Sequence, residues 1–121
     1  MKAAGFDEFG PAEVLHTIEV EPAEPGPGEV RIANKAAGVQ RFDTMIRAGR
    51  GPAEKMITSF PAIPGNEFAG VVDAIGPDVE NVAIGDEVIG WRLLGSYSET
   101  LIAPADQLVP KPPAMSWEIA G

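Results

Sequence analysis

PAIPGNEFAGVVDAIGPDVENVAIGDEVIG, residues 61–90, is the stretch that decides the fold. Within it, residues 67–74 (EFAGVVDA) have the composition of a strand, and Gly70 marks a bulge or a close approach of another backbone. A Gly-Pro-Asp turn signal follows, and a Gly-Asp turn signal precedes a second strand at residues 87–91. Short strands separated by turn residues favour a β-barrel or sandwich over a helical bundle.

The same pattern extends in both directions along the chain. Residues 29–37 are the best-patterned strand, because Val30, Ile32, Asn34 and Ala36 fall on one face at period two. The preceding EPAEPGPG contains three prolines and two glycines, which exclude regular structure there. The remaining expected strands are residues 2–6, 15–20, 97–103 and 107–109.

Two short helices complete the expected architecture. Asp43 is a good N-cap for a helix of one or two turns, and Gly49 supplies its C-terminal stop. Residues 49–65 are expected to form a loop rich in proline and glycine. Ser116 is expected to cap a helix that starts at Trp117, and only about one turn of it is present.

Composition limits the possible functions. The chain has 121 residues, which fits one domain, and its 18 acidic and 9 basic side chains give a net charge of −9. That charge argues against binding to nucleic acids or to anionic membrane surfaces. The absence of cysteine excludes disulfides, zinc–thiolate sites and a cysteine nucleophile. No stretch approaches the roughly 20 apolar residues of a membrane helix, so a cytoplasmic location is expected.

No local motif defines a metal or phosphate site. Neither a G-x-G-x-x-G fingerprint nor a Walker loop occurs, and the Gly-Pro-Gly of residues 26–28 is interpreted as a turn. His16 has no second histidine or cysteine with which to share a metal, so we expect a surface or half-buried histidine. A general-base role for Asp43 competes with the N-cap role, and the N-cap is favoured.

The run PGNEFAG (64–70) is the most unusual local feature. It places the amide of Asn66 and the carboxylate of Glu67 at the entry to a strand, where binding residues concentrate. The alternative is that the glycines set the backbone and that Glu67 pairs with a cation such as Arg47. The residues alone leave both interpretations open. The apolar residues around 91–97, among them Trp91, are expected to be core or hairpin contacts more than a pocket wall.

Four runs, in this order and spacing, resemble one family over essentially the whole chain. They are MKAAGFDEFGPAEVL (1–15), PGPGEVRIANKAAGVQRFDTMIRAG (25–49), the opening stretch (61–90) and GSYSETLIAPADQLVPKP (95–112). They look like the N-terminal domain of medium-chain dehydrogenases and reductases. The resemblance implies a mainly β fold for residues 1–121, a GroES-like partly open β-barrel with one or two short helices. It also implies that residues 110–121 begin the connection to a doubly wound Rossmann domain that the chain lacks.

Departures from the zinc enzymes of this family indicate the zinc-free branch. Gln40 stands where the resemblance would place a cysteine ligand, and Asn66 stands where it would place a histidine ligand, although Glu67 is kept. Phe42 replaces a hydroxyl residue that relays protons. An amide cannot replace a thiolate at catalytic zinc. The chain is therefore similar to quinone oxidoreductases and enone reductases, with no metal site.

The resemblance implies hydride transfer from NADPH to a quinone or an α,β-unsaturated carbonyl, whose oxygen is polarised by hydrogen-bond donors or water. Met45 stands where a tyrosine is common, so it fits only as an apolar wall. NADPH would be held mainly by the missing domain, so the chain alone is expected to bind it weakly and to be inactive. The residues expected at the substrate and cofactor cleft are Gln40, Phe42, Met45, Asn66, Glu67 and Trp91.

A non-enzymatic GroES-like binding or interaction module is the competing hypothesis. A co-chaperonin is a weaker one, because it gives no reason for the dehydrogenase-like motifs. The resemblance also implies a homodimeric parent protein. A domain that normally packs against a partner leaves apolar surface uncovered, so the isolated chain is expected to self-associate.

Overall fold

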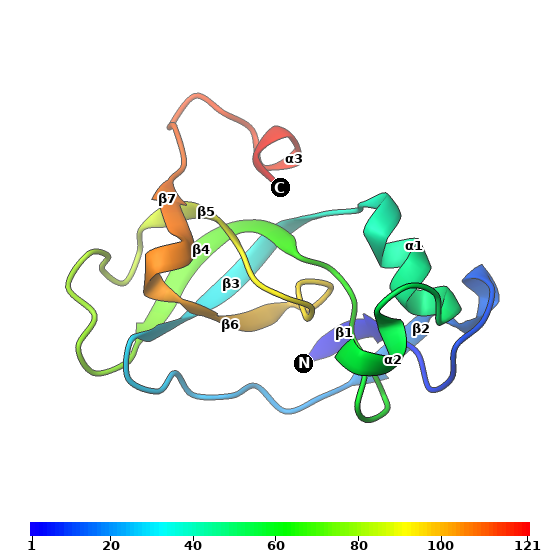
Figure 1. Cartoon of the computed structure of the whole chain (residues 1–121). Coiled ribbons are helices and arrows are strands. Elements are labelled where there is room, and N and C mark those ends of the chain that lie inside the picture. The colour runs from blue at the N-terminus through cyan, green and yellow to red at the C-terminus, as the bar shows by residue number, and fades with distance from the viewer.

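The computed structural model describes every residue from Met1 to Gly121. Its strands form two antiparallel sheets (Figure 1), the first made of β1 (Lys2–Gly5) and β2 (His16–Glu19). The second sheet has the order β6-β3-β4-β5-β7. Its strands are β3 (Glu29–Gly38), β4 (Glu67–Ile75), β5 (Glu87–Trp91), β6 (Thr100–Pro104) and β7 (Leu108–Pro110). Both sheets stay open, which confirms the expected mainly β class.

Short helices occupy the connections between strands. They are α1 (Arg41–Ala48), α2 (Ala53–Met56) and α3 (Trp117–Ala120), with 3-10 turns at η1 (Ala12–Val14) and η2 (Ala105–Gln107). In Figure 1, α1 and α2 lie at the same end of the molecule as β1 and β2, and α3 lies above the large sheet. None of these helices has the length and apolar character needed to cross a membrane.

Two hydrophobic clusters hold the fold together. The alternation along β3 is confirmed in its first half, where Val30 and Ile32 are fully buried. Each such aliphatic or aromatic side chain contributes about 1.5–3 kcal/mol when buried. Asn34 and Ala36 are only partly buried, and a register shift lies between them. The sheet cluster consists of Val30, Ile32, Phe68, Val72, Val88, Leu101, Ala103 and Ala105. The helix cluster, beneath α1 and α2, consists of Phe6, Ile46, Ala53, Ile57 and Ala62.

The expected N-cap of α1 is wrong by three residues. The N-cap is Gln40, in an extended conformation, and Asp43 is the third helical residue. The Asp43 carboxylate accepts a hydrogen bond from the Gln40 backbone N–H at 2.8 Å. Asp43 therefore still stabilises the start of the helix, as the third residue of a capping box. Gly49 ends the helix with a left-handed conformation (φ 80°), as expected.

Two other segments also differ from expectation. The supposed loop at residues 49–65 contains α2, a four-residue helix that buries Ala53 in the helix cluster. The strand expected at residues 97–103 begins only at Thr100, because the preceding residues form a connection held by side chains. Gly70 lies where the carbonyl oxygen of Ala33 approaches too closely to admit a side chain, which confirms the expected close backbone approach.

Lys111 ties α3 to the large sheet. Its side chain is buried, and its ammonium group donates to the carbonyl of Met115 at 2.8 Å and pairs with Glu87 at 3.1 Å. It also lies 4.7 Å from the ring centroid of Trp117. The hydroxyl of Ser116 accepts from the backbone N–H of Ile119 at 3.3 Å, which confirms the expected cap. These contacts compensate for a helix too short to be stable alone.

Candidate functional site

The site begins with Gln40, at the junction of β3 and α1. Its backbone is held by the turn that opens α1, since Asp43 N–H donates to the Gln40 carbonyl at 3.0 Å and Gln40 N–H donates to the Asp43 carboxylate. The half-buried side chain points to β4, where its Nε2 donates to a carboxylate oxygen of Glu67. A charged acceptor makes this a stronger hydrogen bond than one between neutral groups. The amide keeps a second N–H that this bond does not use.

Glu67 and Trp91 lie side by side on the large sheet. Glu67 is the first residue of β4 and pairs with Gly38 on one side and with Trp91 on the other. A side chain at Gly38 would occupy the space of the Glu67 carboxylate, so this glycine makes room for it. Directly opposed residues share one face of a sheet. Glu67 and Trp91 accordingly line one open cavity of about 480 Å³, whose other walls come from β5, η2, β7 and the end of α3.

Asn66 precedes β4 and is oriented by the loop at residues 92–94. Its side-chain oxygen accepts from the Leu94 backbone N–H at 2.7 Å, and its carbonyl accepts from the Arg92 backbone N–H at 2.9 Å. The Nδ2 group makes no hydrogen bond within the chain. Asn66 is therefore a fixed amide with a free donor, one residue from Glu67.

The other two expected site residues lie elsewhere on α1. Phe42 is partly buried against the helix cluster. Met45 lines a separate cavity of about 440 Å³, whose other walls are Ala48 and polar or charged residues of the same helix and its end. The structure thus brings Gln40, Glu67 and Trp91 together, with Asn66 beside them, and places Phe42 and Met45 apart from them.

Asp43 and Tyr97 support the site as a hydrogen-bonded pair, which the sequence did not reveal. The Tyr97 hydroxyl donates to the Asp43 carboxylate at 2.9 Å, on the same oxygen that accepts from Gln40 N–H. Burial, together with the hydrogen bond to Asp43, raises the pKa of the Tyr97 phenol. The sequence indicated only an apolar contact for Tyr97. No local signal reveals this pair, because 54 residues separate its members.

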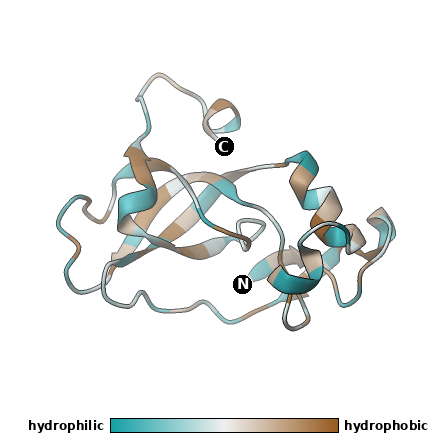
Figure 2. Cartoon of the chain, viewed as in Figure 1, coloured by the Kyte–Doolittle hydropathy of each residue, from teal (hydrophilic) through white to brown (hydrophobic).

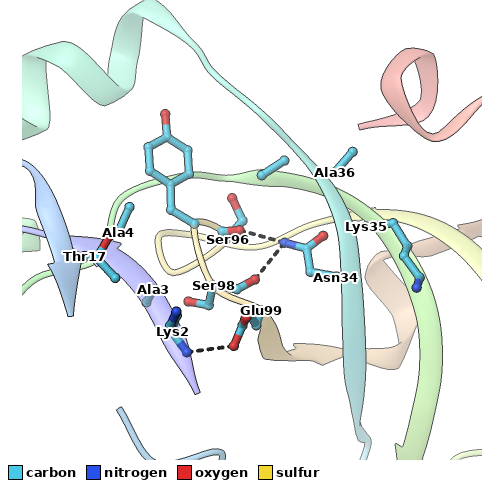
Figure 3. A pocket seen from close by; sticks show the side chains of 12 residues that line it. Lys2, Ala3, Ala4, Thr17, Asn34, Lys35, Ala36, Ser96, Ser98 and Glu99 are labelled. Carbon is cyan, nitrogen blue, oxygen red and sulfur yellow. Dashed lines mark hydrogen bonds between the residues drawn. The ribbon is translucent and has the colours of Figure 1, made fainter. Parts of the chain in front are cut away.

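Tyr97 lines a groove of about 380 Å³ beside β1, and hydrogen bonds between other lining residues position it (Figure 3). Asn34, on β3, donates its side-chain N–H groups to the carbonyls of Ser96 at 2.8 Å and Ser98 at 3.1 Å. Lys2 N–H donates to the Glu99 carboxylate at 2.8 Å. These bonds, drawn as dashed lines in Figure 3, fix the segment that carries Tyr97.

The donor set of the site does not suit zinc. Gln40 and Asn66 present amides, and Glu67 is the single carboxylate among the expected site residues, whereas catalytic zinc takes three protein ligands of the Cys, His and Asp or Glu type. No three such side chains come together anywhere in the chain. Glu67 is bonded to Gln40, and Arg47 instead donates to the Gly10 carbonyl, so the alternative Glu67–Arg47 pair is wrong. His16 is exposed and lies 2.7 Å from Asp7.

Comparison with known proteins relates this geometry to a family. The family model described as "Alcohol dehydrogenase GroES-like domain" matches residues 26–113. A quinone oxidoreductase of Salmonella typhimurium is 41% identical over 116 residues, which cover 95% of this chain and 34% of that protein. A 2-haloacrylate reductase of a Burkholderia species is 39% identical over 95 residues, which cover 78% of this chain and 28% of that protein.

Solved structures agree with the sequence matches. The crystal structure of Escherichia coli quinone oxidoreductase complexed with NADPH superimposes with a TM-score of 0.91 at 36% identity. That match covers 99% of this chain and 36% of the other. The GroES-like assignment of the fold is confirmed by this likeness. The chain spans about a third of the length of the relatives it matches.

Proposed function

Because the chain belongs to the alcohol dehydrogenase GroES-like domain family, on the quinone oxidoreductase side, we propose that it is the substrate-side domain of an NADPH-dependent oxidoreductase. Its substrates are quinones or α,β-unsaturated carbonyl compounds. The observation that supports this most is the Gln40–Glu67 pair beside the cavity under Trp91. The names of the relatives, quinone oxidoreductase and 2-haloacrylate reductase, fit electron-poor double bonds as substrates.

NADPH supplies the hydride in this proposal, and the greater length of the relatives supports a nucleotide-binding domain reached through residues 110–121. The lining of the cavity is half hydrophobic, which suits the partly apolar rings of a cofactor and a substrate. Ile89, Leu108 and Val109 give it apolar walls, and the Trp91 side chain lies at its edge, 56% exposed. Apolar walls of this kind favour contact with the carbon atoms of a ring.

The chain's own contribution is to hold hydrogen-bond donors toward the substrate oxygen. Glu67 accepts one N–H of Gln40, which leaves the second N–H of that amide to donate. Leu94 N–H fixes the oxygen end of the Asn66 amide, so its NH₂ group is the end left for substrate. Amides held in advance stabilise negative charge that develops on a carbonyl or quinone oxygen. This chemistry requires no zinc.

A chimera tests the proposal. This chain would replace the matching segment of Escherichia coli quinone oxidoreductase, whose structure it superimposes on over 99% of its length. We expect the chimera to oxidise NADPH with a quinone as acceptor. Gln40→Leu should lower kcat/KM by roughly 100-fold, the usual loss for one oxyanion donor. Glu67→Gln should lower it less, and the exposed Glu54→Gln serves as the matched control.

The following outcomes would contradict the proposed activity, the proposed site or the zinc-free mechanism. A folded chimera without NADPH oxidation would argue against the reductase. Full activity of both the Gln40 and the Glu67 variants would argue against the site. Elemental analysis after dialysis should find no stoichiometric zinc, and one zinc per chain would contradict the donor-based mechanism. Titration of the chain alone with NADPH should give weak or no binding by cofactor fluorescence.

A further inference from the structure

The guanidinium group of Arg92 has no ionic partner. Arg92 follows β5 and is half-buried, and no carboxylate oxygen lies within 4.0 Å of it. Its side chain makes one hydrogen bond, from Nη1 to the carbonyl of Ile102. A guanidinium has five N–H donors, so four are unused. Partly buried charge without a partner is unfavourable. Burial accordingly lowers the pKa of Arg92, and the more distant Glu29 offsets this only in part.

This side chain forms one wall of a cavity of about 240 Å³. Side chains of Val20, Ile63 and Ile102 give it apolar walls, and the backbone of Gly95 lies against the guanidinium. None of the residues around this cavity lines the one that contains Glu67 and Trp91. The two cavities are therefore separate, although the Arg92 backbone N–H reaches Asn66.

The charges around the cavity favour an anion of low charge. Arg31 also lines it, but its guanidinium is paired with Asp73 at 2.7 Å and Glu24 at 2.9 Å. Glu21 is the only acidic residue of the lining. The N-terminal ammonium of Met1 lines it too, and it pairs with Glu19 at 3.5 Å. Arg92 is thus the one cation of the lining that has no carboxylate oxygen within 4.0 Å. The net charge of −9 disfavours a dianion such as phosphate more than a monoanion.

We propose that this cavity is a binding site for a small organic monocarboxylate, separate from the candidate reduction site. The carboxylate accepts two parallel N–H bonds from Arg92, the geometry that the guanidinium fork suits best. A short branched acyl chain then packs against Val20, Ile63 and Ile102. Binding would use two of the four free donors of Arg92 and fill the apolar space in one step.

The test is a titration of the ¹⁵N-labelled chain with isovalerate, followed by amide chemical shifts. Saturable shifts are expected at Gly95 and Ile102, with a Kd on the order of 1 mM for so small a ligand. Isovaleramide has the same shape without the charge and should bind at least about 10-fold more weakly. Inorganic phosphate, at matched ionic strength, should shift these amides little.

Variants identify the cation. Arg92→Met should weaken isovalerate binding by roughly 10-fold to 100-fold, the factor that corresponds to one charged hydrogen-bonded group. Arg50→Met removes the same charge from an exposed position outside the cavity and should leave the affinity unchanged. Arg92→Lys keeps the charge but loses the two-pronged geometry, so its affinity should fall between those of the wild type and Arg92→Met.

Three outcomes would overturn the proposal. Equal shifts with isovaleramide would remove the role of the charge, and this comparison needs no variant that has to fold. Unchanged affinity in Arg92→Met would remove the role of Arg92. Tighter binding of phosphate than of isovalerate would show a general anion site instead of a carboxylate site.

Discussion

At the scale of single residues, the carboxylate of Asp43 caps helix α1 and also binds a distant tyrosine. It is 4% exposed, and one of its oxygens accepts from both Gln40 N–H and the Tyr97 hydroxyl. Its other oxygen has no partner. Tyr97 therefore helps to hold Asp43, and Asp43 holds the backbone of Gln40, whose side chain donates to Glu67. The Tyr97 hydroxyl itself bonds to neither Gln40 nor Glu67.

Tyr97 should remain protonated in the folded chain at a pH where a free phenol ionises. Its pKa is raised above the ordinary 10.0, first by burial and then by Asp43. The contribution to stability is thus fully present below about pH 10 and is lost as the pH rises through the folded-state pKa. Because Tyr97 is the single tyrosine, tyrosinate absorbance reports on it directly. The absorbance at about pH 10.5 should appear only after denaturant is added.

The variant Tyr97→Phe gives the matching energetic measurement. It removes a hydrogen bond to a buried carboxylate, which should lower the free energy of unfolding at neutral pH by about 1.5–3 kcal/mol. The variant should also lose less stability than the wild type above pH 10. An ordinary phenol titration in the folded wild type would contradict both expectations.

At the scale of elements, the approach to β4 depends on the space around Gly65. Gly65 and Gly85 share the same positive backbone angle, φ 98°. A methyl group at Gly65 would run into the Ser96 hydroxyl and the Tyr97 ring, whereas at Gly85 nothing lies within 4 Å. A comparison of substitutions at these two glycines therefore distinguishes the cost of backbone strain from the cost of steric crowding.

Alanine at these two positions should have unequal effects. Gly85→Ala adds only the backbone cost of a positive φ, about 1 kcal/mol. Gly65→Ala adds overpacking, typically a further 1–3 kcal/mol, and moves Tyr97. Urea unfolding of the two variants measures the difference. Equal losses would mean that the contacts of Gly65 with residues 96 and 97 are unimportant.

Local patterns predicted the elements better than they predicted the site. The strand β5 has the expected bounds, and β3 and β4 extend one residue beyond theirs, because alternation and turn residues act over a few positions. The N-cap of α1 was misplaced because an aspartate suits both the cap and the third helical position. Contacts across 27 residues, as between Gln40 and Glu67, leave no local pattern, and only the resemblance grouped these two.

At the scale of the whole molecule, apolar side chains remain uncovered near the candidate site. Trp91 is 56% exposed, Val109 57% and Ile119 74%. Figure 2 shows the corresponding hydrophobic ribbon on β7 and α3. Trp91 and Val109 line the same cavity, and Ile119 adjoins Ala120 of its wall. Surfaces of this kind are normally covered by a partner.

The isolated chain should therefore self-associate as its concentration rises. Sedimentation velocity at increasing concentration should show growth of a dimer or larger species. Trp91→Ser should weaken this association, while Ile84→Ser, which changes a residue 64% exposed on another loop, should not. A monodisperse monomer at high concentration would contradict the expectation.

The two hydrophobic clusters have a consequence for the thermal behaviour of the site. Gln40 belongs to the end of the molecule built on the helix cluster through Ile46, whereas Glu67 precedes Phe68 of the sheet cluster. Proteins open locally in cooperative units whose free energies differ. The helix cluster has five buried residues against eight in the sheet cluster, so less fully buried surface opposes its opening. If the helix cluster opened alone, the Gln40 amide would move away from the Glu67 carboxylate. The fraction of molecules with an intact site is then set by this local opening equilibrium. Function would then decline on warming before the sheet unfolds.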